Sequence, residues 1–264
     1  MILGLLLGVV VGIVMGLTGA GGGILAVPLL VFGMHLTVAE AGPIGLLAVG
    51  VSAGIGALIG LRAGIVRYRA ALLIASSGVL FAPLGVWLAH RLETRLLSLL
   101  FAALLAWVAY RTFKEIGRRS AESTSLTVDR PCIRNDMSGR FIWTSKCAGA
   151  LSIAGAIAGV FSGLLGVGGG FVMVPALQRS TNLATQSIVA TSLAVIALVS
   201  LTCLAASMSA GNFNVSVALP FATGSLVGMG VGNVLTSHIS PKYLKVAFAL
   251  ICLAVATGMI AKSL

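Results

Sequence analysis

The stretch Gly16-Leu-Thr-Gly-Ala-Gly-Gly-Gly-Ile-Leu-Ala-Val-Pro-Leu-Leu30 occurs twice in this chain, the second time as Gly163-Leu-Leu-Gly-Val-Gly-Gly-Gly-Phe-Val-Met-Val-Pro-Ala-Leu177. The second copy begins 147 residues after the first, and nine of the fifteen positions are identical. In each copy a glycine cluster interrupts an apolar run, and a short apolar segment with a proline follows. Inside a bilayer, interrupted backbone is tolerated only where it is buried in protein or lines a cavity. Two such breaks at matching positions in two halves indicate the binding site of a transporter.

The whole chain has the composition of a helical membrane protein. Of its 264 residues, 58% are hydrophobic and only 9% are charged, whereas soluble domains carry about 25% charged residues. The mean hydropathy is +1.11. Uncharged runs of about twenty residues, the length of a transmembrane helix, recur along the sequence, and the alternating ten-residue segments of a β-barrel are not evident. We therefore predict an all-α integral membrane protein in a lipid bilayer.

The duplication extends beyond the glycine clusters and predicts two transmembrane repeats. The first repeat covers residues 1–113, the second covers 146–264, and a polar, basic linker at 114–145 joins them. The offset of 147 residues persists without a gap through both halves, which indicates a duplicated unit. We expect about eight long spans and two short segments that follow the breaks. The long spans are Ile2–Leu17, Ala41–Leu61, Ala70–Ala89, Leu96–Ala109, Cys147–Leu165, Ser187–Met208, Val215–Leu235 and Leu244–Ala261, and the short segments are Ile24–Phe32 and Phe171–Leu177.

The positive charge is concentrated in the connections between spans. Eight of the 17 Lys and Arg residues lie between Arg111 and Lys146, which fits the excess of Lys and Arg in cytoplasmic loops. The net charge of +11 is therefore not evidence for nucleic acid binding. With a cytoplasmic linker, inverted repeats put 14 of these charges inside and 3 outside, and parallel repeats put 12 inside and 5 outside. The counts favour inverted repeats with the N-terminus outside, and parallel repeats are the alternative.

The glycine clusters offer a way to bind an anion without a charged side chain. A helix that starts inside the membrane exposes about four unpaired backbone N–H groups and a partial positive charge from its dipole, which together favour an anion. Glycine also lets the backbone approach a ligand closely. The alternative is that these glycines only permit close helix packing. The candidate residues are Gly21, Gly22 and Gly23 with Pro28, and Gly168, Gly169 and Gly170 with Pro175. We expect Gly22→Ala or Gly169→Ala to weaken anion binding more than folding.

Few polar side chains are available within the spans. Outside the linker region the only acidic residues are Glu40 and Glu93, both near span ends, so a buried cation site or a carboxylate proton relay has little support. An anionic or neutral substrate is favoured. Thr191 and Ser192 are candidate hydroxyl ligands, although such hydroxyls often bond to their own helix. In the first half the position equivalent to Ser192 is occupied by Gly45, which has no hydroxyl.

Catalysis has little support in the sequence. No nucleophile elbow and no metal-binding spacing of His or Cys is present, so we predict no enzyme activity, no cofactor and no metal site. The four cysteines likewise lack the spacing of a disulfide framework, and we interpret them as small apolar residues or free thiols. They are Cys132, Cys147, Cys203 and Cys252.

The paired motifs resemble those of the TauE/SafE family of sulfite and sulfonate exporters. The resemblance rests on the glycine clusters ending in Val27-Pro28 and Val174-Pro175, and on Ala190-Thr191-Ser192-Leu193. It covers both halves of the chain. The first half departs from the pattern at Ile44-Gly45, where the second half has Thr191-Ser192. The residues to which the family motif carries over are Gly19, Gly21, Gly22, Gly23, Pro28, Gly166, Gly168, Gly169, Gly170, Pro175, Thr191 and Ser192.

The resemblance implies a multi-pass secondary carrier in the bacterial inner membrane that exports a small inorganic or organosulfur anion. Members of the family are linked to sulfite, sulfoacetate, thiosulfate and other organic anions, and the proton gradient is often proposed as the energy source. An anion channel is one alternative, because static helix breaks also form selectivity filters. A non-transporting membrane assembly or scaffold protein is another. The sequence does not fix the oligomeric state, with a homodimer among the alternatives.

Overall fold

The computed structural model describes residues 2–119, 132, 144–181, 183–209, 214–235 and 241–263. Throughout this part of the chain the structure is helical, apart from short connections and a single bridge between Cys132 and Thr181. The first half contains α1 (Ile2–Thr18), the 3₁₀ helix η1 (Gly19–Leu25), α2 (Ala26–Gly33), α3 (Val38–Arg62), α4 (Tyr68–Arg91) and α5 (Thr94–Arg119). The second half contains α6 (Ser145–Leu165), α7 (Gly170–Ser180), α8 (Thr185–Ser209), α9 (Val215–Leu235) and α10 (Pro241–Ser263).

The all-α membrane class predicted from the sequence is confirmed. Six of the helices, namely α3, α4, α5, α6, α8 and α9, are long and apolar enough to cross a bilayer by length and composition. The other two predicted long spans form α1 and α10, whose described apolar parts, Ile2–Thr18 and Val246–Ala261, are shorter. The predicted linker at 114–145 lies mostly outside the described residues. The structure differs at its start, because α5 continues as helix to Arg119.

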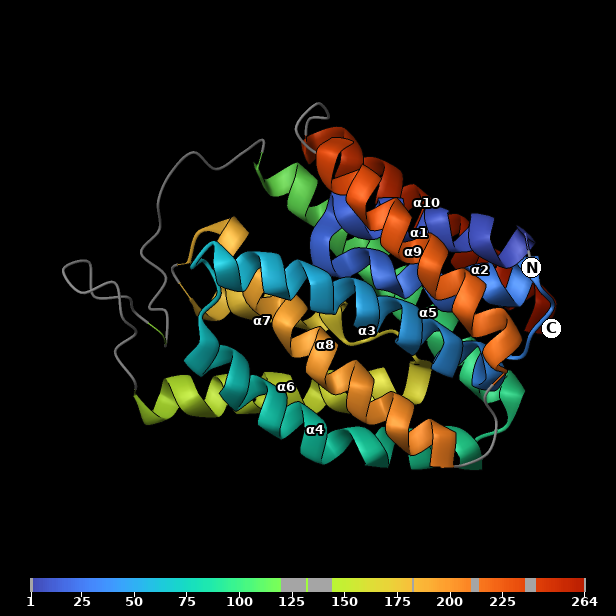
Figure 1. Cartoon of the computed structure of the whole chain (residues 1–264), viewed down its shortest axis with the longest axis horizontal. Helices are drawn as coiled ribbons and strands as arrows, with labels where there is room; N and C mark the ends of the chain where they lie inside the picture. Colours follow the sequence, from blue (N-terminus) through green and yellow to red (C-terminus); the bar gives the residue numbers. More distant parts are fainter. Residues whose placement is uncertain are drawn as a thin grey trace.

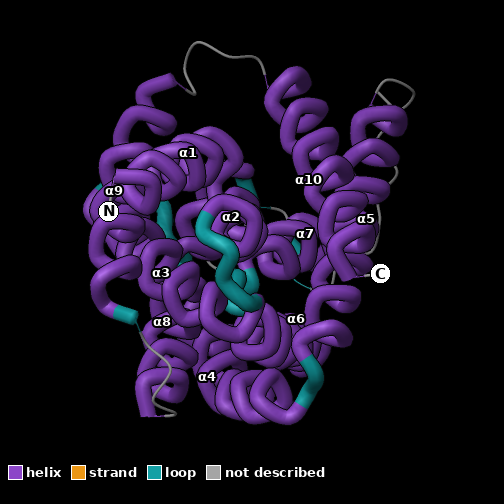
Figure 2. Tube along the Cα trace, turned by 90° about the vertical axis from the view of Figure 1, so that its right-hand side faces the viewer, coloured by secondary structure: helices purple, strands orange, loops and turns teal. Residues whose placement is uncertain are grey.

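The helices pair across the two halves in a pattern that the duplication relates to itself. Helix α1 packs against α9 and α6 against α4, while α3 contacts α9 and α8 contacts α4. The two remaining close pairs are α3 with α8 and α5 with α10. Exchanging each helix for its equivalent 147 residues away converts this set of pairs into itself. Figure 2 looks along the bundle and shows the short helices α2 and α7 in its interior, surrounded by the longer helices.

Glycines allow the closest of these helix pairs to form. A methyl group added at Gly8 or Gly12 of α1 would collide with the backbone of α9, at Phe221 and Ser225. Gly159 of α6 is equally close to the backbone of α4. Because apolar burial does not drive helices together within lipid, close van der Waals packing of this kind supplies much of the attraction.

The two halves run from one end of the bundle to the other and back. Figure 1 shows the N- and C-termini at the same end of the molecule. The end of α5 and the start of α6 lie at the opposite end. Each half, α1 to α5 and α6 to α10, therefore begins at one end of the molecule and finishes at the other.

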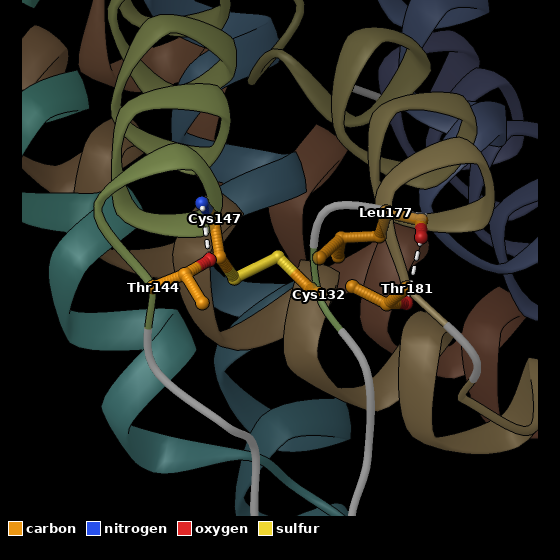
Figure 3. The surroundings of a disulfide bond; sticks show 5 residues. All are labelled: Cys132, Thr144, Cys147, Leu177 and Thr181. Carbon is orange, nitrogen blue, oxygen red and sulfur yellow. Dashed lines mark hydrogen bonds between the residues drawn. A yellow bond between two sulfur atoms is a disulfide. The ribbon is translucent and has the colours of Figure 1, made fainter. Parts of the chain in front are cut away.

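A disulfide corrects the interpretation of two cysteines. Cys132 and Cys147 are bonded, with their Cα atoms 5.0 Å apart (Figure 3). The backbone N–H of Cys132 donates to Ser180 O at 3.1 Å, which holds this point of the chain against the end of α7. Cys147 lies in the first turn of α6, where its N–H donates to the Thr144 hydroxyl. The sequence did not predict the pairing, because a separation of 15 residues matches no disulfide motif. The contact of residue 132 with the end of α7 is visible only in the structure. The remaining cysteines, Cys203 and Cys252, are free and buried as expected.

Candidate functional site

The first glycine break, residues 19–25, is a continuous 3₁₀ helix between α1 and α2. Its first residue, Gly19, has a positive φ of 75°. The preceding hydroxyl, of Thr18, donates to Val14 O at 2.7 Å within α1. The interruption predicted from the sequence is therefore a change of helix type in which the chain remains helical through Leu25.

The first break packs tightly against its own hairpin. A methyl group at Gly22 would collide with the backbone of Met15 in α1. Gly23 is buried, and a methyl group there would lie 3.0 Å from Val49 Cγ2 and 3.2 Å from Val167 O. Pro28 is buried in α2. We therefore expect Gly22→Ala to damage folding, which differs from the sequence-based expectation of a mainly ligand-binding effect.

The second glycine break, residues 166–169, is a true interruption. Gly166, Gly168 and Gly169 have φ values of 70°, 76° and 69°, in the left-handed region that glycine adopts without steric penalty. Gly166 closes α6 by donating its N–H to Ser162 O at 2.9 Å. Gly169 is the N-cap of α7, a new helix of 11 residues. In the first turn of α7, which begins at Gly170, the N–H of Val172 donates to Gly169 O at 3.1 Å, and the first N–H groups of a helix have no acceptor within the helix itself.

The second break lies against the middle of α3 and α8. A methyl group at Gly168 would lie 2.9 Å from Val49 Cγ1, 3.1 Å from Ile196 Cγ2 and 3.1 Å from Ser200 Oγ. Val49 and Ile196 are equivalent positions in the two halves. Since Gly23 of the first break also faces Val49, both breaks meet at the point where α3 and α8 cross. The structure thus brings the duplicated motifs together.

Thr191 and Ser192 are buried at the start of α8 but already have partners. The Thr191 hydroxyl accepts a hydrogen bond of 3.1 Å from the backbone N–H of Arg67, before α4. The Ser192 hydroxyl donates to Ile188 O in its own helix at 2.8 Å. Their role as ligands stays a prediction. Pro175 is half-buried inside α7, and Gly166 packs against Gly42 so closely that a methyl group would collide with it.

Buried hydroxyls near the second break were missed from the sequence. Ser200 is 1% exposed, and its Oγ has no hydrogen-bond partner. One turn further along α8, the Cys203 thiol donates to Ser162 Oγ at 3.7 Å. On the other side of the centre, Ser52 and Ser225 share a hydrogen bond of 2.9 Å. The sequence did contain a signal for Ser200. Under the 147-residue offset its equivalent in the first half is Ala53, so the two halves differ by a hydroxyl at this position.

The Glu40 carboxylate caps a helix. It accepts from the Thr37 backbone N–H at 2.9 Å and from the Thr37 hydroxyl at 2.8 Å, forming with Thr37 a capping box that starts α3. This carboxylate is exposed at the helix end. Among the described residues no group of three or more His, Cys, Asp or Glu could hold a metal ion.

Comparison with known proteins identifies the family. The model of the family described as sulfite exporter TauE/SafE matches residues 4–259. The chain belongs to this family. The matched range includes both glycine motifs and confirms the resemblance found in the sequence.

Individual relatives agree with this assignment. The chain is 32% identical over 253 residues to a probable membrane transporter protein of Xylella fastidiosa strain Temecula1, which covers 94% of this chain and 90% of the relative. A probable membrane transporter protein of Bacillus subtilis, YunE, is 24% identical over 233 residues, or 86% of this chain and 85% of the relative. No solved structure matches this TauE/SafE protein.

Proposed function

We propose that this protein is a secondary transporter that exports a small sulfur oxyanion, sulfite or a short organosulfonate, across the bacterial inner membrane. The observation that carries the proposal is the second glycine break. There, three left-handed glycines precede the N-terminus of α7, and this terminus faces the crossing of α3 and α8 through Gly168. The family description and the names of the relatives support transport in general.

Backbone N–H groups are the ligands in this proposal. The start of α7 would supply the N–H groups of Gly170 and Phe171, which have no acceptor within the helix, and the positive end of the helix dipole. Donors that belong to the backbone hold an oxyanion without the large desolvation penalty of a buried Lys or Arg in the membrane. The first break contributes mainly a wall, through Gly23 against Val49 and Val167.

The site is closed in this arrangement. Val49 and Ile196 lie so near Gly168 that even an added methyl group would crowd them. An anion would enter when α3 or α8 moves away from the second break, and it would leave when the equivalent movement occurs on the other side. Rocking of one repeat against the other around a central site is the usual mechanism of two-repeat carriers.

The proton in this scheme travels with the substrate. Among the described side chains the carboxylates, Glu40 and Glu93, are exposed, so the proposal does not use them as a relay. Sulfite is protonated to bisulfite near neutral pH. Export of bisulfite moves one proton outward with the anion, whereas export of sulfite moves none.

We also propose that the repeats are inverted, with about eight spans, a cytoplasmic linker and the N-terminus outside. The helix pairs that map onto each other under the 147-residue offset support a two-fold relation. The location of both termini at one end (Figure 1) supports the inversion, because the first half ends where the second begins. In this orientation 14 of the 17 Lys and Arg residues are on the cytoplasmic side, as the positive-inside rule requires.

Labelling tests this topology. Single cysteines replace Leu3 and Ser120 in a chain whose four native cysteines are changed to serine, and intact cells are treated with a membrane-impermeant maleimide. We expect Leu3→Cys to react in intact cells and Ser120→Cys only after permeabilisation. Equal protection at both sites would contradict the inverted arrangement.

Counterflow in proteoliposomes tests the transport function. Vesicles containing the purified protein are loaded with unlabelled sulfite and diluted into trace labelled sulfite. A carrier accumulates label transiently above equilibrium, because exchange depends on alternating access. A channel would only equilibrate the label, and an assembly protein would give the same signal as empty vesicles, so either result would overturn the proposal.

A further inference from the structure

We propose that the Ser200 hydroxyl is a direct ligand of the oxyanion at the second glycine break, which makes the binding site single and asymmetric. The inference rests on the proposed function and names a side chain within that site. Ser200 belongs to none of the motifs that carry the family resemblance. Its assignment comes from three features of the structure: burial, an unused hydrogen-bonding group and the position of that group.

A buried hydroxyl without a partner is uncommon. Ser200 is 1% exposed, and its Oγ makes no hydrogen bond, although large majorities of buried polar atoms in proteins are paired. The residue has an alternative that it does not use, because a serine in a helix often donates to the carbonyl four residues earlier. Ser192 in the same helix does so, with Ile188 O as its acceptor. The partner of Ser200 is accounted for if it arrives with the substrate.

The hydroxyl is placed to act together with the backbone donors. Ser200 Oγ is 3.1 Å from the position that a Gly168 side chain would occupy, and Gly168 directly precedes Gly169, the N-cap of α7. An anion that displaces Val49 from Gly168 therefore meets the first N–H groups of α7 on one side. It meets the Ser200 hydroxyl on the other. Donors from two directions suit a ligand with several acceptor oxygens, such as a sulfur oxyanion.

The equivalent region of the first break is apolar. The positions that correspond to Ser200, Ser162 and Cys203 are occupied by Ala53, Met15 and Gly56. Ser162 and Cys203 already interact with each other, so Ser200 is the hydroxyl available for a ligand. Duplicated halves that differ in this way provide one polar binding position near the centre, whereas two symmetric positions would place two anions close together, where they repel each other.

Ser200→Ala and Thr202→Val form a pair for the test. Both remove a hydroxyl from α8, but only the first removes an unpartnered one, because the Thr202 hydroxyl donates to Leu198 O at 3.1 Å. The purified full-length protein in detergent is titrated with sulfite, and binding is followed by the rise in melting temperature. We expect Ser200→Ala to weaken sulfite binding by about tenfold or more, the loss expected for a hydrogen bond to a charged group, while Thr202→Val binds like the wild type.

The melting temperature without ligand separates a binding role from a structural one. Removing an unpaired buried hydroxyl relieves a desolvation penalty, so we expect Ser200→Ala to melt at the wild-type temperature or above it. A marked decrease would show that Ser200 stabilises the fold and would overturn the inference. So would wild-type sulfite affinity in Ser200→Ala, or an equal loss in Thr202→Val, and these results would leave the proposed function intact. Absence of any sulfite response in the wild-type protein would instead overturn the proposed function, and this inference with it.

Discussion

The two glycine breaks share most of their sequence but differ in backbone structure. The first keeps helical geometry through a 3₁₀ segment that begins with a positive φ at Gly19. The second has three left-handed glycines and starts a new helix. The residues around the glycines differ as well. Phe171 at the start of α7 packs edge-to-face on Phe161 of α6, with ring centroids 6.2 Å apart, and the equivalents are the aliphatic Ile24 and Val14.

The comparison teaches that a repeated motif does not imply two equal sites. Conserving the glycines in both copies preserves the ability to break a helix, but neighbouring side chains decide how the break is used. In this protein the first break is packed against apolar groups such as Met15 and Val49. The second break is next to the hydroxyl of Ser200 and close to the pair formed by Ser162 and Cys203.

The largest expected effect distinguishes Gly166→Ala from Gly19→Ala. Both positions have positive φ, which costs an alanine about 1–2 kcal/mol. At Gly166 the new methyl group would also collide with the backbone of Gly42, whereas at Gly19 it would meet only the side chain of Val189, 2.7 Å away. We expect no folded monodisperse protein from Gly166→Ala and a partial loss of stability from Gly19→Ala, as seen by size-exclusion chromatography and thermal melting.

Gly149→Ala is the control for this experiment. Gly149 lies in α6, and nothing is within 4 Å of the methyl group it would gain. Alanine is favoured over glycine in a helix by about 1 kcal/mol, so this variant should be at least as stable as the wild type. Equal stability of Gly166→Ala and Gly149→Ala would show that the second break is not held in its left-handed geometry.

Loss of the disulfide should have an intermediate effect on stability, confined to the hairpin formed by α6 and α7. Cys132 and Cys147 connect the end of α7 with the start of α6, and among the described residues the hairpin of α1 and α2 has no such bond. Closing a loop of about 15 residues stabilises a protein by about 3 kcal/mol in the chain-entropy model. We expect Cys132→Ser to lower the melting temperature measured without reductant, and dithiothreitol to lower that of the wild type only.

The cellular redox state links this bond to the topology. Disulfides are rare in the cytoplasm, where thiols are kept reduced. With a cytoplasmic linker, we expect acid-trapped extracts of growing cells to contain Cys132 and Cys147 as thiols, and a disulfide to form after treatment with diamide. A fully formed disulfide before treatment would favour the opposite orientation of the chain in the membrane.

The smallest expected effect is that of Glu40→Gln. The glutamate is part of the capping box at the start of α3, and glutamine forms the same box. If the proton travels with the substrate at the second break, the variant should keep at least partial sulfite transport, with little change in melting temperature. Complete loss of transport at normal expression and sulfite binding would identify Glu40 as the proton relay and would contradict proton transfer by the substrate.

The sequence alone determined the class of this protein, the approximate limits of its helices and the positions of both breaks. These features follow from local chemistry, because runs of apolar residues set the spans and clusters of glycine end a helix wherever they occur. The comparison of the two copies also indicated a duplicated unit, and the helix pairs of the structure map onto each other under the same offset. The cap formed by Thr37 and Glu40 is a local signal of the same kind.

Tertiary structure decided the properties that distinguish the two breaks. The left-handed geometry at Gly166, Gly168 and Gly169 accompanies the close packing of this segment against α3, and glycine by itself permits several conformations. The unpartnered state of Ser200 depends on which groups α3, α7 and α8 bring within hydrogen-bond distance of it. The bond between Cys132 and Cys147 depends on where the chain returns after α5. Each depends on how separate segments of the chain are brought together, and such relations are fixed only when the helices pack.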